Sequence, residues 1–177
     1  AFDTQHDILE YLAKKFSQMN HYQFLAEFED HFDSIIVLPI YTQLIYNQVL
    51  NATSVLKAMD YPQNLIDYTN DTALQEMVPI INRFNQNLSY LLQPKGHLFV
   101  LSDIFQSAHK EAFHNRVTSS MHSRTLMDEV YLEYLDKHGY GIGDYGLYAL
   151  SEDFNFIDYQ WIIWPFEEKL DMIVKIA

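Results

Sequence analysis

The chain has 177 residues, 49% of them hydrophobic and 20% charged, which is enough for one folded domain with its own core. Its 11 Lys and Arg residues against 24 Asp and Glu residues give a net charge of −13. Such a charge disfavours binding to the phosphate backbone of nucleic acids and to anionic membranes. With no cysteine and only 5 glycines, the composition excludes a disulfide scaffold, a thiolate zinc site and a collagen-like chain.

The first half of the chain alternates helical patterns with one short apolar run. Apolar residues at helical spacing predict a helix over 6–19. The β-branched, uniformly apolar run at 34–39 is typical of a strand buried on both faces of a parallel sheet. Helical spacing returns over 41–59 and 73–92, where Pro79 either kinks the helix or begins it.

The second half of the chain repeats this alternation and adds a glycine-rich connection. In order, the pattern predicts a strand over 97–101, helices over 104–117 and 125–138, strands over 146–156 and 157–164, and a partly helical segment over 166–176. Buried strands that alternate with helices favour an α/β domain. The alternative is an all-α domain in which both short apolar runs are buried helix segments.

Three segments follow one another in a suggestive order: AFDTQHDILEYLAKKF at 1–16, FDSIIVLPIY at 32–41 and YLLQPKGHLFVLSD at 90–103. In this order they resemble the class I methyltransferases, Rossmann-like enzymes that use S-adenosylmethionine. The first segment is similar to the end of that family's second strand with the helix that follows. The second is similar to the fourth strand with its catalytic-side loop, and the third to the turn and fifth strand.

The resemblance implies an open, mostly parallel Rossmann-like sheet with flanking helices and a C-terminal antiparallel strand pair. Residues 1–177 would form a single methyltransferase-like domain, with a helical insertion at about 42–72 that covers a substrate pocket or forms a dimer surface. The family's glycine-rich first motif is missing, because the glycines at 139–146 follow a helix and precede a strand. That motif is expected upstream of Ala1, in a chain truncated at this point.

The resemblance also implies residues that bind the cofactor. Asp3, at the end of an early strand, would accept hydrogen bonds from both ribose hydroxyls; its alternative role is that of a carboxylate at a helix N-terminus. Phe28 would pack on the adenine ring, and its alternative is a core aromatic residue. Glu27, Glu29 or Asp30 would approach the adenine amino group, with Glu29 placed in the cofactor-binding set, and the alternative for all three is a solvated run of charges.

The tetrapeptide Leu38-Pro39-Ile40-Tyr41 stands where amino-methylating relatives carry Asn or Asp, Pro, Pro and an aromatic residue. Leu38, which joins the cofactor-binding set, cannot accept a hydrogen bond from a target amine. This departure disfavours an adenine or glutamine amine as the methyl acceptor. Pro39 and Tyr41 match the family and form the predicted catalytic pair, with the ring of Tyr41 as a platform for the substrate. The alternative for Tyr41 is a buried core tyrosine.

The expected function is therefore S-adenosylmethionine-dependent methyl transfer to a small-molecule or protein acceptor, in a cytoplasmic chain. Nucleic acid is a less favoured acceptor, no membrane partner is expected, and a homodimer is left open. The alternative function is that of a non-enzymatic, all-helical ligand-sensing or dimerisation domain of a regulator. Circular dichroism distinguishes the two, because only the first requires strands.

The 8 histidines of the chain raise the question of a metal site. Glu111 and His114 have the Glu-x-x-His spacing of di-iron helical bundles, which need two such motifs and two further carboxylates. A second motif is not found, and His109 and His114 would diverge if both lay on one helix. The sequence therefore predicts solvated histidines and no metal site.

Overall fold

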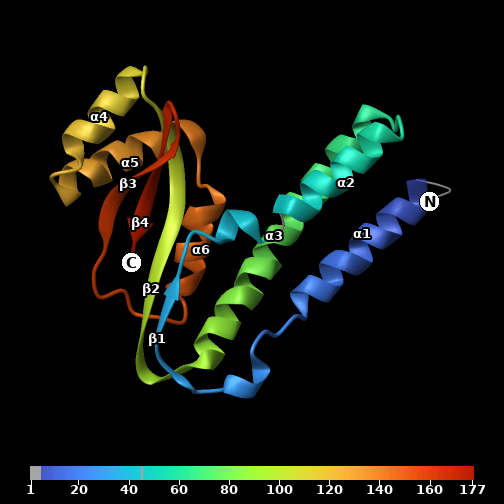
Figure 1. The fold of residues 1–177 in the computed structure, drawn as a ribbon, viewed down its shortest axis with the longest axis horizontal. Helices are drawn as coiled ribbons and strands as arrows, with labels where there is room; N and C mark the ends of the chain where they lie inside the picture. Colours follow the sequence, from blue (N-terminus) through green and yellow to red (C-terminus); the bar gives the residue numbers. More distant parts are fainter. Residues whose placement is uncertain (1–4, 45) are drawn as a thin grey trace. The chain divides into compact units, whose positions relative to one another are not determined.

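The structure is a computed structural model that describes residues 5–44 and 46–177, and the chain divides into two compact units (Figure 1). The first unit comprises residues 1–32 and 42–94, and the second comprises residues 33–41 and 95–177. Across the described residues, no helix combines the length and the apolar character that a membrane span requires.

The first unit is helical. Helices α1 (Gln5–Asn20) and α2 (Tyr46–Ala58) both pack against α3 (Gln63–Leu91), and the short 3-10 helix η1 (Ala26–Phe28) follows α1. Buried residues recur along α3 at helical spacing: Leu65, Ile66, Ala73, Met77, Ile80, Ile81, Leu88 and Leu91. The helices expected over 6–19 and 41–59 are confirmed in α1 and in α2, although a 3-10 turn, η2 (Tyr41–Gln43), precedes α2.

Helix α3 begins about ten residues earlier than expected and continues through Pro79. It starts after Pro62, whose φ of −58° already suits a helix, so the expected start at residue 73 is wrong. Pro79 lies in the helix interior, where it has no N–H to donate to the carbonyl one turn before it.

The substitution Pro79→Ala is expected to stabilise the first unit. An interior proline costs a helix about 3 kcal/mol relative to alanine, and part of this gain is offset by the greater freedom of the unfolded chain. A net rise of about 1–2 kcal/mol in the free energy of unfolding should appear in denaturation followed by circular dichroism. Gln75→Ala, at an exposed position on the same helix, is the control and should change stability by less than about 0.5 kcal/mol. An unchanged or lower stability of Pro79→Ala would contradict the prediction.

The second unit contains three helices and a four-stranded sheet, except that Phe32 and residues 92–94, at the starts of two strands, are assigned to the first unit (Figure 1). The strands are β1 (Phe32–Val37), β2 (Leu92–Ala108), β3 (Gln160–Glu167) and β4 (Leu170–Ile176), in the order β1-β2-β4-β3. Strands β1 and β2 run parallel, whereas β4 is antiparallel to both β2 and β3, and the sheet curls into a half-barrel. The helices are α4 (Ala112–Ser120), α5 (Arg124–His138) and α6 (Ile142–Leu150).

This sheet overturns the fold class expected from the sequence. An open, mostly parallel Rossmann-like sheet is wrong, because only one strand pair is parallel, and the all-α alternative is wrong because the sheet exists. The segment 170–176, expected to be partly helical, is β4, one of the two interior strands of the sheet. The strand predicted at 34–39 is present as β1, but it lies at the edge of the sheet and is largely exposed. It is therefore not buried on both faces.

Several other elements of the second unit depart from the sequence pattern. The strand expected at 97–101 is part of β2, which continues to Ala108, so residues 104–108 of the helix expected over 104–117 are strand and α4 begins only at Ala112. The strand expected over 146–156 is instead the end of α6 and a loop, while the strand expected over 157–164 overlaps β3. The helix expected over 125–138 is confirmed as α5.

Local signals explain the limits of α5. It begins after Ser123, whose Oγ accepts a hydrogen bond from the N–H of Leu126 at 3.4 Å, and it ends at Gly139, whose φ is +72°. The helix lies on the sheet face that carries Phe105 and Trp161, because Tyr134 stacks on Phe105 at 4.5 Å between ring centroids and Tyr131 contacts Trp161 at 5.2 Å. Helix α5 thereby forms one wall of the candidate site.

Candidate functional site

The structure describes five of the six residues that the sequence assigns to a site. Asp3 lies outside the described residues. In the first unit, the ring centroid of Phe28 lies 5.3 Å from that of His31, and the Glu29 carboxylate accepts a hydrogen bond from the Tyr90 hydroxyl at 3.2 Å. Both residues are held by contacts within their own unit.

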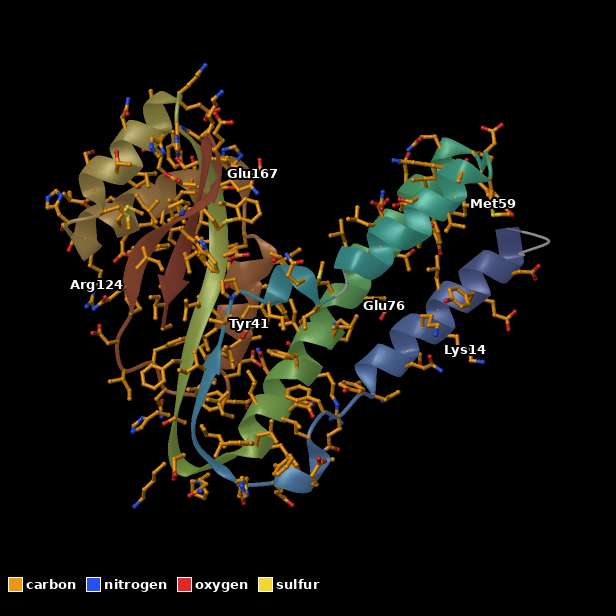
Figure 2. The ribbon with its side chains drawn as sticks, viewed as in Figure 1. Lys14, Tyr41, Met59, Glu76, Arg124 and Glu167 are labelled. Atoms are coloured by element: carbon orange, nitrogen blue, oxygen red, sulfur yellow. The ribbon has the colours of Figure 1, made fainter. Side chains whose placement is uncertain are left out.

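The other three residues, Leu38, Pro39 and Tyr41, belong to the second unit and follow β1. The side chain of Leu38 is exposed, whereas Tyr41, labelled in Figure 2, is 1% exposed. The ring of Tyr41 packs so closely on α6 that a Cβ atom on Gly146 would lie 2.4 Å from it. Tyr41 is therefore buried, as the alternative interpretation expects. The binding and catalytic roles assigned from the sequence stay predictions for all of these residues.

A different set of side chains converges in the second unit, around a pocket of about 380 Å³. The pocket lies between α5, α6, the chain before β3 and the end of β4. Five aromatic residues line it: Tyr131, Tyr140, Tyr148, Phe156 and Tyr159. A second cavity of about 410 Å³ shares Phe156 and Tyr159 with it, so the two cavities adjoin. The volume of the tyrosine-lined pocket falls in the range of about 300–1,000 Å³ that is usual for small-molecule sites.

Lys175 of β4 is the cation of this pocket. It pairs with Trp161 across the strands, and its Nζ lies 4.0 Å from the ring centroid of Tyr159, 5.2 Å from that of Trp161 and 5.9 Å from that of Tyr131. Within the described part of the chain it forms no ion pair. Burial lowers the pKa of Lys175, although the nearby carboxylates of Asp128 and Asp144 oppose the shift.

Asp144 of α6 is already engaged through both of its oxygens. Its Oδ1 accepts a hydrogen bond from the Tyr131 hydroxyl, and its Oδ2 accepts one from the Gly141 N–H at 2.9 Å, at the N-terminus of α6. Burial raises the pKa of Asp144, against the effect of these hydrogen bonds. Burial and the hydrogen bond to Asp144 also raise the pKa of Tyr131, which therefore stays a neutral phenol.

Asp128 of α5 is engaged in the same way. It accepts hydrogen bonds from the Tyr159 hydroxyl at 2.5 Å and from Trp161 Nε1 at 2.8 Å. The ring of Tyr159 is also covered by Arg124, labelled in Figure 2, whose guanidinium lies 4.8 Å from the ring centroid and pairs with Asp158. These contacts fix the aromatic walls around Lys175.

The chemistry of the pocket follows from this division of roles. The carboxylates hold the tyrosine and tryptophan side chains in place. Among the residues that the structure describes, the Lys175 ammonium contacts aromatic rings and forms no ion pair. Sequence reasoning missed this site because it assigned Lys175 to a partly helical segment and Asp144 to a flexible connection. The available signal was a single lysine within the apolar run LDMIVKI at 170–176.

No protein-family model, no curated protein and no solved structure matches this chain. The functional argument therefore starts from the side chains of the second unit.

Proposed function

We propose that the second unit is a small-molecule-binding module whose tyrosine-lined pocket holds a planar, neutral ligand with a carbonyl oxygen against Lys175. The observation that carries this proposal is that Lys175 lines the pocket with its Nζ among three aromatic rings and without an ion pair among the described residues. A partly buried ammonium of this kind gains most from a ligand that supplies a hydrogen-bond acceptor.

Charge favours a neutral acceptor over an anion. Two carboxylates, Asp128 and Asp144, act on the single ammonium of Lys175, so an anionic ligand would add to an excess of negative charge. A carbonyl oxygen accepts the hydrogen bond of the ammonium without that penalty. The shape of the ligand follows from the walls, because aromatic side chains favour offset or edge-to-face packing against a flat ring.

The proposal keeps the ligand-binding part of the alternative drawn from the sequence, although the all-helical fold expected with it is wrong. An aromatic ketone, 4-hydroxyacetophenone, is a suitable probe, and 4-hydroxybenzoate is an anion of similar shape. Because the chain has 2 tryptophans, a Trp164→Phe background leaves Trp161, which lies beside Lys175, as the reporter of fluorescence quenching.

We expect saturable quenching by 4-hydroxyacetophenone at one site and weaker binding of 4-hydroxybenzoate. Lys175→Met should weaken binding of the ketone about 10- to 100-fold, since a hydrogen bond to a charged group contributes about 1.5–3 kcal/mol. Lys169→Met, in the exposed turn between β3 and β4, is the control and should bind as the unsubstituted chain does. Binding that Lys175→Met leaves unchanged, or no saturable binding at all, would refute the proposal.

Methyl transfer with S-adenosylmethionine as cofactor stays a proposal from the sequence. Its motifs were assigned to a parallel sheet, and the strands β2, β4 and β3 are antiparallel, so the fold lends it no support. Calorimetric titration of S-adenosylmethionine is its direct test. Saturable one-site binding would favour it over the neutral carbonyl ligand.

A further inference from the structure

Three side chains that sequence reasoning treated as solvated meet near one end of the sheet in the second unit. His109 follows β2, His114 lies in the first turn of α4, and Asp171 is in β4. His109 Nε2 lies 3.1 Å from Asp171 Oδ1, and His114 Nε2 lies 3.9 Å from Asp171 Oδ2. One ligand atom from each residue lies within 4.8 Å of the others.

The prediction that the two histidines diverge on one helix is wrong. Strand β2 runs to Ala108, so His109 stands in the connection before α4 and its ring turns toward that of His114, at 4.8 Å between centroids. The backbone N–H of His109 donates to the carbonyl of Lys169 at 3.1 Å, which anchors this connection beside the start of β4. Tertiary contacts therefore assemble the cluster.

A buried hydroxyl orients one of the imidazoles. Ser107 Oγ lies 3.2 Å from His114 Nδ1, and Ser107, which is 1% exposed, pairs with Asp171 across β2 and β4. In the tautomer in which Nδ1 donates to this hydroxyl, Nε2 of His114 presents its lone pair to the cluster. Metal-binding histidines are usually held in this way, through a hydrogen bond at the ring nitrogen that does not bind the metal.

The spacing suits a tetrahedral ion. Zinc–nitrogen and zinc–oxygen bonds of about 2.0–2.1 Å place neighbouring ligand atoms about 3.3 Å apart. The two imidazole nitrogens lie 3.1 Å and 3.9 Å from the two oxygens of Asp171, and one ligand atom of each residue lies within 4.8 Å of the others, so small side-chain rotations bring the three to that spacing. The side chains of His114 and Asp171 are 12% and 11% exposed, whereas that of His109 is 40% exposed and leaves a path to solvent. We propose that His109, His114 and Asp171 bind a divalent transition-metal ion of the zinc class, with Ser107 as the positioning residue.

Two imidazoles, one carboxylate and a position left for water form the ligand set of catalytic rather than closed structural zinc sites. The cluster shares no residue with the Lys175 pocket. A failure of either proposal would therefore leave the other standing.

The test is calorimetric titration of the whole chain with Zn²⁺ in buffered salt with excess Mg²⁺, followed by visible spectroscopy of the Co²⁺ form. We expect one saturable site and the intense d–d absorption of four-coordinate Co²⁺. His109→Ala changes the most exposed ligand and should weaken Zn²⁺ binding by about tenfold or more, while Ser107→Ala should weaken it about 10- to 100-fold. Thermal unfolding of the unsubstituted chain should shift upward with Zn²⁺, because the ion binds the folded state.

The control is His122→Ala, an exposed histidine in the turn before α5, which should bind Zn²⁺ unchanged. Asp171→Asn and His114→Gln should remove the four-coordinate Co²⁺ spectrum, and circular dichroism checks that each variant is folded. Because the side chain of His109 is the most exposed of the three ligands, His109→Ala tests the metal site even if a variant at a buried ligand fails to fold. Absence of a saturable site, or Zn²⁺ binding that His109→Ala leaves unchanged, would overturn the proposal.

Discussion

Gly143→Ala is expected to unfold the second unit or to destabilise it by more than about 3 kcal/mol. A Cβ atom at this position in α6 would lie 1.8 Å from the backbone oxygen of Asp103 and 2.8 Å from Ser102 Oγ. Ser102 is fully buried and donates a hydrogen bond to the Gly143 carbonyl at 2.9 Å. The backbones of α6 and β2 are therefore in direct contact at Gly143, and moving them apart to admit a methyl group would break the hydrogen bond from Ser102.

Gly141→Ala is the control for this prediction. It lies two residues away, at φ −88°, and a Cβ atom there would meet its nearest neighbours at 3.4 Å and 3.5 Å, which is ordinary contact. Its stability should change by less than about 1 kcal/mol. Chemical denaturation of the unsubstituted chain, Gly143→Ala and Gly141→Ala, followed by near- and far-UV circular dichroism, measures the loss of stability in each variant. Similar midpoints for Gly143→Ala and Gly141→Ala would show that α6 does not approach the strand this closely.

Asp144→Ala is expected to cost about 2–4 kcal/mol, because it leaves the Tyr131 hydroxyl and the Gly141 N–H without an acceptor. Each unsatisfied buried donor costs about 1–3 kcal/mol, and water that enters the smaller side chain's space recovers part of this. Chemical denaturation gives the free energy directly. The control is Asp153→Ala, an exposed carboxylate in the loop after α6, for which a change within about 0.5 kcal/mol is expected.

Asp144 also makes the stability depend on pH. Burial raises its pKa in the folded state above the value of 3.8 in the unfolded chain. At pH values between the raised pKa of the folded state and 3.8, the folded state binds the proton of Asp144 more tightly than the unfolded chain does. The contribution of Asp144 to stability therefore grows as the pH falls through this window. Above the raised pKa, the carboxylate is charged in the folded state as well, and the cost of burying that charge is present in full.

The measurement is the free energy of unfolding of the unsubstituted chain minus that of Asp144→Asn, taken at intervals from neutral pH to about pH 4. Asparagine cannot ionise, so the difference isolates the carboxylate. It should become more positive as the pH falls. Asp153→Asn, measured in the same series, is the exposed comparison. A difference that is constant with pH, or that becomes more negative on acidification, would contradict the raised pKa.

The candidate site shows why part of this protein could not be predicted from its local pattern. Lys175 gains its aromatic neighbours from α5 and from the chain around β3, and Asp144 gains its two donors from α5 and the start of α6. His109, His114 and Asp171 likewise come from three elements. Each of these residues is polar and unremarkable in its own segment, and only contacts between distant segments give it a partner.

The sequence by itself determined the elements whose signals are local. Helical spacing placed α1 and α5, a serine and a glycine mark the ends of α5, and β-branched runs placed β1 and part of β2. Only the tertiary structure decided that 170–176 is an interior strand of the sheet and that β2 extends to Ala108. In β4 the polar Asp171 and Lys175 interrupt the apolar pattern, and they are tolerated there because neighbouring strands and helices supply their partners. The pairing order of the sheet depends on those same long-range contacts, which no local periodicity encodes.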